Sequence, residues 1–238
     1  MTRPLSRHLP ARSYARGIEA RRRIIDVAIT AFGDLGFDGA STRAIAKLAR
    51  VKLGSLRYYF GNKEKLYLAC AEHIATYGEE RLEAFANRIG AMVTGSDGSR
   101  ERLLDIARMV VETSLEHFLT PQHPSPWVMF LVREQMNPGP GYDIMYQRFT
   151  RRFVGLWSGL VGRILGRPAN DEVSLLKTFC VMGQLFTFER NLYTVKRTLG
   201  WDQINDKRLA KMKRALWQQI EGGLLCSHRR TSVQRKDF

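Results

Sequence analysis

Cysteine is scarce in this sequence, whose 238 residues include only Cys70, Cys180 and Cys226. The three are far apart, and no two have the Cys-x-x-Cys spacing of zinc ligands. The pattern therefore predicts neither a metal site nor a disulfide framework. Because disulfide-free chains are usual in a reducing compartment, we expect a cytoplasmic protein. We also expect no metal and no other cofactor.

Long hydrophobic runs are also missing. No window of about 18 residues is apolar and uncharged, which is the length that a membrane-spanning helix needs. The first residues carry several arginines but no apolar segment of the kind found in secretion signals. We expect no membrane partner, and we interpret residues 1–19 as a disordered basic arm.

Motifs that indicate catalysis are absent as well. The chain contains no Gly-x-Ser-x-Gly nucleophile turn, no glycine-rich phosphate loop and no His-Glu-x-x-His zinc motif. Asp105, Glu112 and Glu116 have the spacing of charge pairs on an exposed helix face rather than of paired catalytic acids. An enzyme is therefore not expected.

Positive charge, in contrast, is abundant, and the formal net charge is +15. Residues 1–66 hold 14 Lys and Arg against 5 Asp and Glu, so 9 of the 15 surplus charges lie in this segment. A basic surface attracts polyanions through long-range electrostatics. The sign alone does not separate nucleic acid from an anionic membrane, but it places the basic end at the N-terminus.

Helical periodicity runs through the whole chain, and no segment alternates long enough to predict a strand. Near the N-terminus, the apolar spacing predicts a helix that ends at Gly36 and two short helices, one after Ser41 and one over 53–60. A longer helix follows, for which Asn62 is a suitable cap. Two short helices after a bracing helix are typical of a helix-turn-helix.

The rest of the chain predicts further helices, over about 103–118, 127–136, 142–165, 171–199 and 206–225, with Gly183 as the expected break within 171–199. We therefore expect an all-α fold with an N-terminal three-helix helix-turn-helix domain and a larger C-terminal helical domain. The predicted boundaries are 20–66 for the first domain, 67–226 for the second and 227–238 for a polar tail.

A family resemblance strengthens this interpretation. The segment IIDVAITAFGDLGFDGASTRAIAKLARVKLGSLRYYFGNKEKLY, residues 24–67, resembles the DNA-binding domain of the TetR family almost position by position. Three further stretches, VREQMNPGPGYDIMY, GQLFTFERN and LGWDQI, are similar to the ligand-binding domain of the CerR/CecR-type subgroup. The resemblance implies a C-terminal domain that contains a small-molecule cavity and dimerises through its last two long helices.

This resemblance, together with position and side-chain chemistry, assigns two sets of DNA-binding residues. Backbone phosphates are expected at Thr42, Arg43, Tyr58, Tyr59 and Lys63. Base edges are expected to be contacted by Lys52, Leu53, Ser55 and Arg57, with Gly54 allowing close approach of the backbone. The basic arm can reach the minor groove or can merely raise non-specific affinity.

Two residues depart from the family pattern. Arg50 stands where these proteins usually have glycine in the turn, and Lys52 stands where serine or asparagine usually caps the recognition helix. A lost cap costs about 0.5–2 kcal/mol. We therefore expect either a slightly remodelled turn or extra phosphate contacts from the two added charges.

Apolar side chains of the C-terminal domain are candidates for the ligand cavity, although each one taken alone fits plain core better. They are Trp127, Met129, Phe130, Met136, Phe179, Met182 and Phe186. Arg133 and Glu134 can orient a polar ligand group or form a structural ion pair. An apolar stripe predicted for dimerisation comprises Leu175, Phe179, Met182, Phe186, Trp217, Ile220 and Leu224.

These observations predict a homodimeric, sequence-specific DNA-binding transcription regulator. Its two recognition helices are expected to enter successive major grooves about 34–36 Å apart on operator DNA. We expect a repressor that a small-molecule effector releases from the operator. The alternatives are a non-specific DNA-compacting protein, for which only the charge would matter, and a helical enzyme or lipid carrier with an accidentally basic end.

Overall fold

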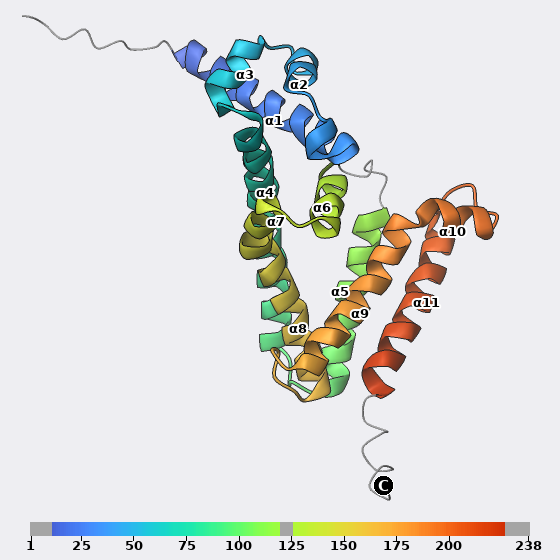
Figure 1. The fold of residues 1–238 in the computed structure, drawn as a ribbon. Coiled ribbons are helices and arrows are strands. Elements are labelled where there is room, and N and C mark those ends of the chain that lie inside the picture. The colour runs from blue at the N-terminus through green and yellow to red at the C-terminus, as the bar shows by residue number, and fades with distance from the viewer. Residues whose placement is uncertain (1–10, 120–125, 227–238) are drawn as a thin grey trace, which may run out of the picture. The chain divides into compact units, whose positions relative to one another are not determined.

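A computed structural model of the protein describes residues 11–119 and 126–226. Over these ranges every regular element is a helix and no strand is present, which confirms the predicted all-α fold (Figure 1). The helices form two compact units, each with its own hydrophobic core. Of the described residues, 11–79 and 126–149 belong to the first unit, and 80–119 and 150–226 belong to the second.

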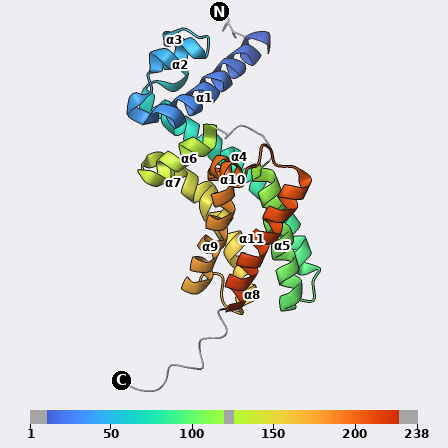
Figure 2. The same ribbon diagram turned by 90° about the vertical axis from the view of Figure 1, so that its right-hand side faces the viewer.

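The first unit contains the expected helix-turn-helix. Its elements are α1 (Ala11–Gly39), α2 (Thr42–Leu48), α3 (Leu53–Phe60), the start of α4 (Lys63–Thr94), α6 (Pro126–Met136), α7 (Pro140–Met145) and the π-helix η1 (Tyr146–Thr150). Helices α2 and α3 pack against each other and against α1 (Figures 1 and 2). Helix α6 also packs along α1, which brings a segment from the middle of the chain into the DNA-binding unit.

Helix α1 is longer than the apolar spacing indicated. Residues 11–19 are helical, so the prediction of a disordered arm over 1–19 is wrong for this part; residues 1–10 lie outside the described residues. Alanine, arginine and glutamate are strong helix formers, and Glu19 and Arg23 form an i,i+4 ion pair of 3.0 Å. The predicted break at Gly36 is confirmed by its φ of 75° and ψ of 175°.

The core of the first unit explains the helical spacing seen in the sequence. Each of its helices α1 to α4 contributes side chains that solvent hardly reaches, and α6 adds an aromatic ring. They include Ile24, Ala28 and Phe32 of α1, Ile45 of α2, Leu56 of α3, Leu66 and Cys70 of α4, and Phe130 of α6. Leu35, predicted on the same inward face of α1, is instead exposed, because the chain leaves the helix one residue later.

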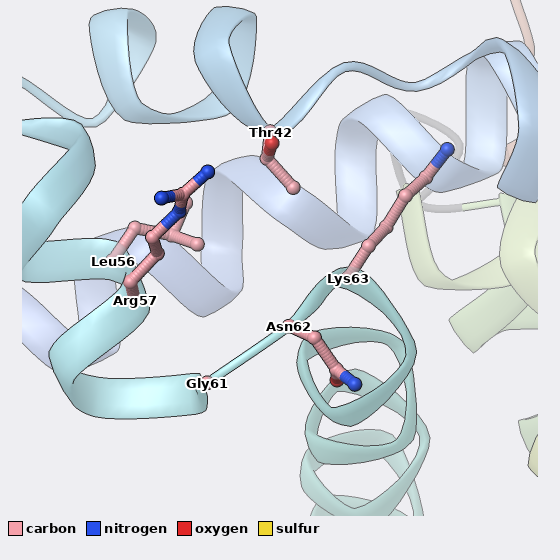
Figure 3. Close-up of a pocket in the computed structure, with 6 residues that line it drawn as sticks. All are labelled: Thr42, Leu56, Arg57, Gly61, Asn62 and Lys63. Carbon is pink, nitrogen blue, oxygen red and sulfur yellow. The ribbon is translucent and has the colours of Figure 1, made fainter.

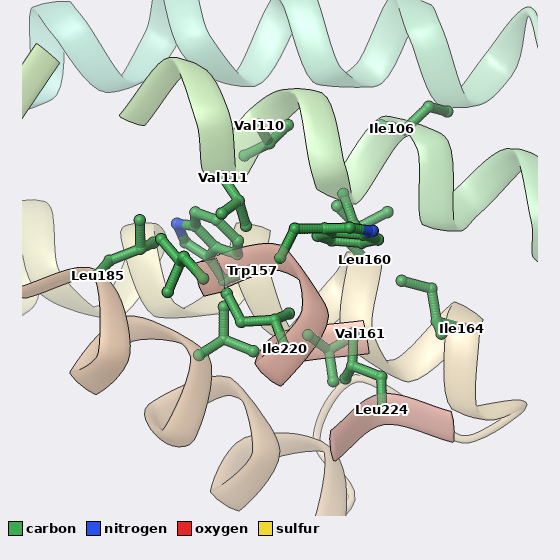
Figure 4. Packing of buried hydrophobic residues seen from close by; sticks show 14 of the residues in the cluster. Ile106, Val110, Val111, Trp157, Leu160, Val161, Ile164, Leu185, Ile220 and Leu224 are labelled. Carbon is green, nitrogen blue, oxygen red and sulfur yellow. The ribbon is translucent and has the colours of Figure 1, made fainter. Parts of the chain in front are cut away.

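The second unit is a bundle around a separate core. It contains the end of α4, α5 (Arg100–Leu119), α8 (Arg151–Leu165), α9 (Glu172–Arg190), α10 (Leu192–Thr198) and α11 (Asp206–Leu225). Helices α5, α8, α9 and α11 all pack against one another (Figure 2). Figure 4 shows part of the core between them, including Val111 of α5, Trp157 of α8, Leu185 of α9 and Ile220 of α11.

Two long predicted helices are divided in the structure. The segment predicted as one helix over 142–165 consists of α7, the π-helix η1 and α8. The segment predicted over 171–199 breaks at Asn191 rather than at Gly183. Asn191 has non-helical dihedral angles, and its side-chain amide donates to the carbonyl of Thr187, whereas Gly183 stays within the helix.

Candidate nucleic-acid interface

Helix α3 is a short helix with one buried and one exposed face. Leu56 and Phe60 fix it to the core of the first unit, and only 1% and 6% of these residues is exposed. On the opposite face lies Tyr58, which is 84% exposed. Such a large exposed aromatic side chain contributes little to the chain's own packing. The helix therefore presents a surface that is available to a partner.

The residues predicted to contact base edges all lie on this helix or directly before it. Lys52, Gly54 and Arg57 are exposed, whereas Leu53 and Ser55 are half-buried. The exposed side chains include two cations with hydrogen-bond donors, which match the acceptors of guanine in the major groove. The geometry is compatible with base contacts, and the assignment of each residue stays a prediction.

The consecutive aromatic residues of α3 have three different environments. Phe60 is buried, Tyr59 is half-buried and Tyr58 is exposed. Successive residues in a helix point in directions about 100° apart, so they cannot all face inward. The rings of Tyr58 and Tyr59 are 5.4 Å apart in an edge-to-face arrangement. This arrangement leaves the hydroxyl-bearing side chain of Tyr58 free for a phosphate contact.

A pocket lies where three helices of the first unit meet. It has a volume of about 450 Å³ and is lined by residues from the start of α2, the end of α3 and the start of α4: Thr42, Leu56, Arg57, Gly61, Asn62 and Lys63. Figure 3 shows that the side chains of Thr42 and Arg57 reach this space from different helices. The N-terminus of a helix attracts anions through its free N–H groups and its dipole. The pocket therefore suits a phosphate group.

Lysine 63 is held in place at this pocket. Its ammonium nitrogen Nζ lies 3.3 Å from the carbonyl oxygen of Asp38 and 4.7 Å from the centre of the Phe37 ring. The neighbouring Asn62 accepts a 2.8 Å hydrogen bond from the backbone N–H of Lys65, which confirms its predicted role as the cap of α4. Sequence reasoning did not include Gly61 and Asn62 in the binding surface, although their stop-and-cap pattern marked the position.

The turn between α2 and α3 has the backbone geometry that glycine prefers. Arg50 has a φ of 55°, the only positive φ at a non-glycine residue in the described chain. Two hydrogen bonds close the helix: Val51 N–H donates to Ala46 at 2.9 Å, and Arg50 N–H donates to Lys47 at 3.1 Å. This is a Schellman motif with Arg50 at the left-handed position. Arg50 thus takes the left-handed conformation that glycine adopts most readily, and it carries backbone strain.

Neither short helix of the motif has a side-chain cap. Ser41 occupies the N-cap of α2, and Lys52 occupies the N-cap of α3, both in extended conformation and both without a side-chain hydrogen bond to the helix. Ser41 therefore does not act as a hydroxyl cap for α2. The first N–H groups of both helices remain available for another acceptor, such as a phosphate oxygen.

The candidate ligand contacts belong to two different units. Six of them lie on α6 in the first unit: Trp127, Met129, Phe130, Arg133, Glu134 and Met136. The other three, Phe179, Met182 and Phe186, lie on α9 in the second unit. Among those on α6, Phe130 is part of the core, Met136 is 83% exposed and Trp127 packs against Tyr77 at 4.4 Å between ring centres. A single cavity that contains all nine stays a prediction.

Arg133 and Glu134 contact two different helices. Arg133 donates to the backbone carbonyls of Gly33 and Asp34 on α1. Glu134 is 4% exposed and accepts a hydrogen bond from the hydroxyl of Tyr67 on α4. Burial, together with this carboxylate, raises the pKa of Tyr67 well above its usual value. The sequence contained no signal for either contact, because the partners are far apart along the chain.

The stripe predicted for dimerisation is divided between buried and exposed positions. Trp217, Ile220 and Leu224 of α11 lie in the core of the second unit, and Met182 of α9 is also buried. Phe179, another member of the stripe, is 56% exposed on α9, and the nearby Leu176 is 58% exposed. The end of α11 adds Leu225, and Lys177 ties the two helices through a 2.7 Å hydrogen bond to the carbonyl of Gly223.

The described residues contain no group of three or more His, Cys, Asp or Glu side chains that is placed to hold a metal ion. None of the described helices has the length and apolar character that crossing a membrane requires.

Comparison with known families gives two matches. The family described as "Bacterial regulatory proteins, tetR family" matches residues 24–70. The family described as "HTH-type transcriptional dual regulator CecR, C-terminal domain" matches residues 100–224. The HTH-type transcriptional dual regulator CecR of Shigella flexneri is 26% identical over 193 residues, which is 81% of this chain and 86% of CecR.

Solved structures with a similar fold include two ligand complexes. AibR in complex with isovaleryl coenzyme A and operator DNA has a TM-score of 0.54 and 17% identity, and covers 84% of this chain and 97% of its own. The transcriptional regulator FadR of Bacillus subtilis in complex with stearoyl-CoA has a TM-score of 0.52 and 15% identity, and covers 85% and 98%. At these identities the likeness concerns the fold alone.

Proposed function

The chain belongs to the TetR family of bacterial transcription regulators and carries a C-terminal domain of the CecR type, and from this premise we propose how it works. Two copies associate, place their α3 helices in successive major grooves of an operator and repress transcription until a small-molecule effector binds. Since the operator is chromosomal DNA, the protein acts in the cytoplasm. This role requires no catalytic step.

One observation carries the DNA-binding part of the proposal: the exposed face of α3 adjoins a pocket formed at the starts of α2 and α4. Arg57 belongs to both features, because it is exposed on α3 and lines the pocket. Helix N-termini and basic side chains hold phosphates, whereas side chains along a recognition helix distinguish base pairs. The combination suits sequence-specific recognition better than plain electrostatic attraction.

Dimerisation is proposed to use the exposed face of α9. Leu176 and Phe179 are large apolar side chains that this chain leaves uncovered, and Leu225 lies at the end of the adjoining helix α11. Exposed apolar patches on a helix are typical of interfaces with a partner. A second copy of the chain would bury them. Light scattering at working concentration tests this, and a monomeric mass would contradict it.

The effector is proposed to act by preferring one of two conformations. A ligand shifts such an equilibrium only by its difference in affinity for the two states. AibR and FadR were solved with isovaleryl coenzyme A and stearoyl-CoA respectively. These relatives support a small-molecule effector for this chain, and acyl-coenzyme A thioesters are reasonable first compounds to test in a DNA-release assay.

The decisive experiment compares an operator from the protein's own promoter region with random DNA at physiological salt. Specific binding predicts a ratio of affinities of about 10³ or more, whereas a ratio near one would favour the non-specific compacting protein. Arg57→Ala is expected to weaken operator binding by about 1–3 kcal/mol per half-site through loss of its contacts. Arg108→Ala on α5 removes the same charge from the second unit and serves as the matched control.

A further inference from the structure

Helix α6 is attached to the end of helix α1 by the side chain of Arg133. Its Nε lies 2.5 Å from the carbonyl oxygen of Gly33, and its Nη2 lies 2.6 Å from the carbonyl oxygen of Asp34. Gly36, two residues further along, has a φ of 75° and breaks α1. Gly33 and Asp34 therefore belong to the last turn before this break, where carbonyl groups lack partners within the helix. The guanidinium supplies both missing donors and a positive charge at the negative end of the helix dipole.

The same contact is reinforced by the close approach of the two helices. A Cβ atom at Gly33 would lie 2.9 Å from the carbonyl oxygen of Pro126 and 3.3 Å from the Cβ of Met129. The first turn of α6 thus rests directly on α1, at a position where a larger side chain does not fit. Arg133, further along α6, then reaches the same turn of α1. Helix α6 holds this turn at two points.

The turn leads directly into the DNA-contacting surface. Phe37 and Asp38 follow Gly36, and both are contacted by Lys63 at the start of α4. Helix α2 begins at Thr42, which lines the proposed phosphate pocket. We call residues 36–41 the α1–α2 corner. Lys63 of α4 thus holds the corner itself, and Arg133 of α6 holds the turn of α1 that precedes the corner.

Glu134, the next residue of α6, gives the helix a second attachment. It accepts the hydrogen bond of Tyr67, whose ring stacks on Phe130 with 4.8 Å between ring centres. Tyr67 lies on α4 one turn after Lys63. Helix α6 therefore bridges the end of α1, which leads into the corner, and the start of α4, whose Lys63 contacts the corner.

We propose that Arg133 is a positioning residue for operator binding: its guanidinium fixes the end of α1, and through the α1–α2 corner it sets the place of Thr42 in the phosphate pocket. The inference rests on the proposed function of the site. A positioning role is inferred rather than a direct DNA contact, because Nε and Nη2 of Arg133 both donate to backbone carbonyls of its own chain.

The test measures operator affinity of the full chain with Arg133→Gln and Arg133→Lys. Glutamine removes the charge and the two-pronged donor, and we expect affinity to fall about tenfold, the size typical of losing charge-assisted hydrogen bonds at a partly exposed site. Lysine keeps the charge but cannot span two carbonyls, so operator affinity should still fall a few-fold. Arg108→Gln, whose guanidinium Nε pairs with Glu112 at 2.8 Å in the second unit, is the control for charge.

Salt dependence separates positioning from a direct phosphate contact. Losing one phosphate contact reduces the slope of log affinity against log salt by about 0.9, whereas loss of a positioning residue leaves the slope unchanged. A reduced slope for Arg133→Gln would overturn the inference. Circular dichroism and thermal unfolding identify variants that are folded at the assay temperature. If Arg133→Gln is not folded, the same comparison is made with Arg133→Lys.

Failure of this inference differs from failure of the proposed function. If the wild-type chain does not distinguish its operator from random DNA, the proposed function is overturned and the inference falls with it. If the wild-type chain does so and a folded Arg133 variant binds the operator with unchanged affinity, only the inference is overturned. A tenfold loss at an unchanged salt slope, with Arg108→Gln within twofold of wild type, supports it.

Discussion

Replacing Arg50 by glycine should stabilise the first unit. The residue has a φ of 55° at the left-handed position of the Schellman motif that ends α2. A side chain in this conformation destabilises the folded state by about 1–2 kcal/mol, and glycine removes this strain. Glycine also raises the entropy of the unfolded chain, which offsets about 0.5–1 kcal/mol of the gain. The net gain of Arg50→Gly is therefore about 0.5–1 kcal/mol, with little change in the turn itself.

Arg50→Ala is the matched control, because it removes the same charge and side chain but keeps the strained Cβ. Thermal or urea unfolding of the three proteins should place Arg50→Gly above both others, with Arg50→Ala close to wild type. For a chain of this size, about 1 kcal/mol raises the melting temperature by about 2–4 °C. If the glycine variant is no more stable than the alanine variant, the reasoning about left-handed strain is wrong.

The same two variants test the second possibility that the sequence left open, an extra phosphate contact by Arg50. Both variants lose the charge, so both should lose about 0.9 from the salt slope of operator binding if the contact exists. Equal slopes in all three proteins would show that Arg50 does not neutralise a phosphate. Stability and DNA binding thus report on the backbone and on the side chain separately.

Two other substitutions have predictable signs. Lys52→Ser supplies a cap at the uncapped start of α3 and should raise the free energy of unfolding in urea by about 0.5–1 kcal/mol. A lower free energy of unfolding would argue against a missing cap. If Lys52 holds a phosphate, the same substitution also lowers the salt slope of operator binding. For Glu189, burial raises the pKa of the carboxyl group, with Arg190 opposing the shift. The folded state therefore binds the proton more tightly than the unfolded state, so this group's stabilising contribution is present at acidic pH and is lost as pH rises through the folded-state pKa. Glu189→Gln should accordingly stabilise the protein more at pH 7 than at pH 4, and the opposite order would contradict the assignment.

The recognition surface was largely predictable because its signals are local. The ends of α2 and α3 depend on residues within a turn or two, and the break at Gly36 and the cap at Asn62 appear where the residue types indicate. The buried face of α3 follows from the spacing of Leu56 and Phe60. The opposite face is then exposed as a matter of geometry. Thus the candidate DNA contacts could be named without coordinates.

Local signals were weaker where several outcomes are close in energy. The apolar spacing at 142–165 fits one continuous helix, but the structure inserts the π-helix η1. Within it, Phe149 packs on Gly78 of α4, where a Cβ would lie 2.8 Å from the ring, and Arg148 binds Glu72 and Glu79 of the same helix. Such contacts with α4 involve residues about 70 positions away. No periodicity along a single segment contains that information.

By itself, the sequence determined the helical fold, the helix-turn-helix and its exposed basic face, because helix formation and capping depend on residues three or four positions apart. Only the tertiary structure decided that α6 belongs to the DNA-binding unit, and that Arg133 and Glu134 hold helices α1 and α4. Arg133 and Gly33 are 100 positions apart, and Tyr67 and Glu134 are 67 apart. Contacts over such separations depend on how whole helices pack, and a charged residue in an apolar segment does not reveal in advance which helix it will meet.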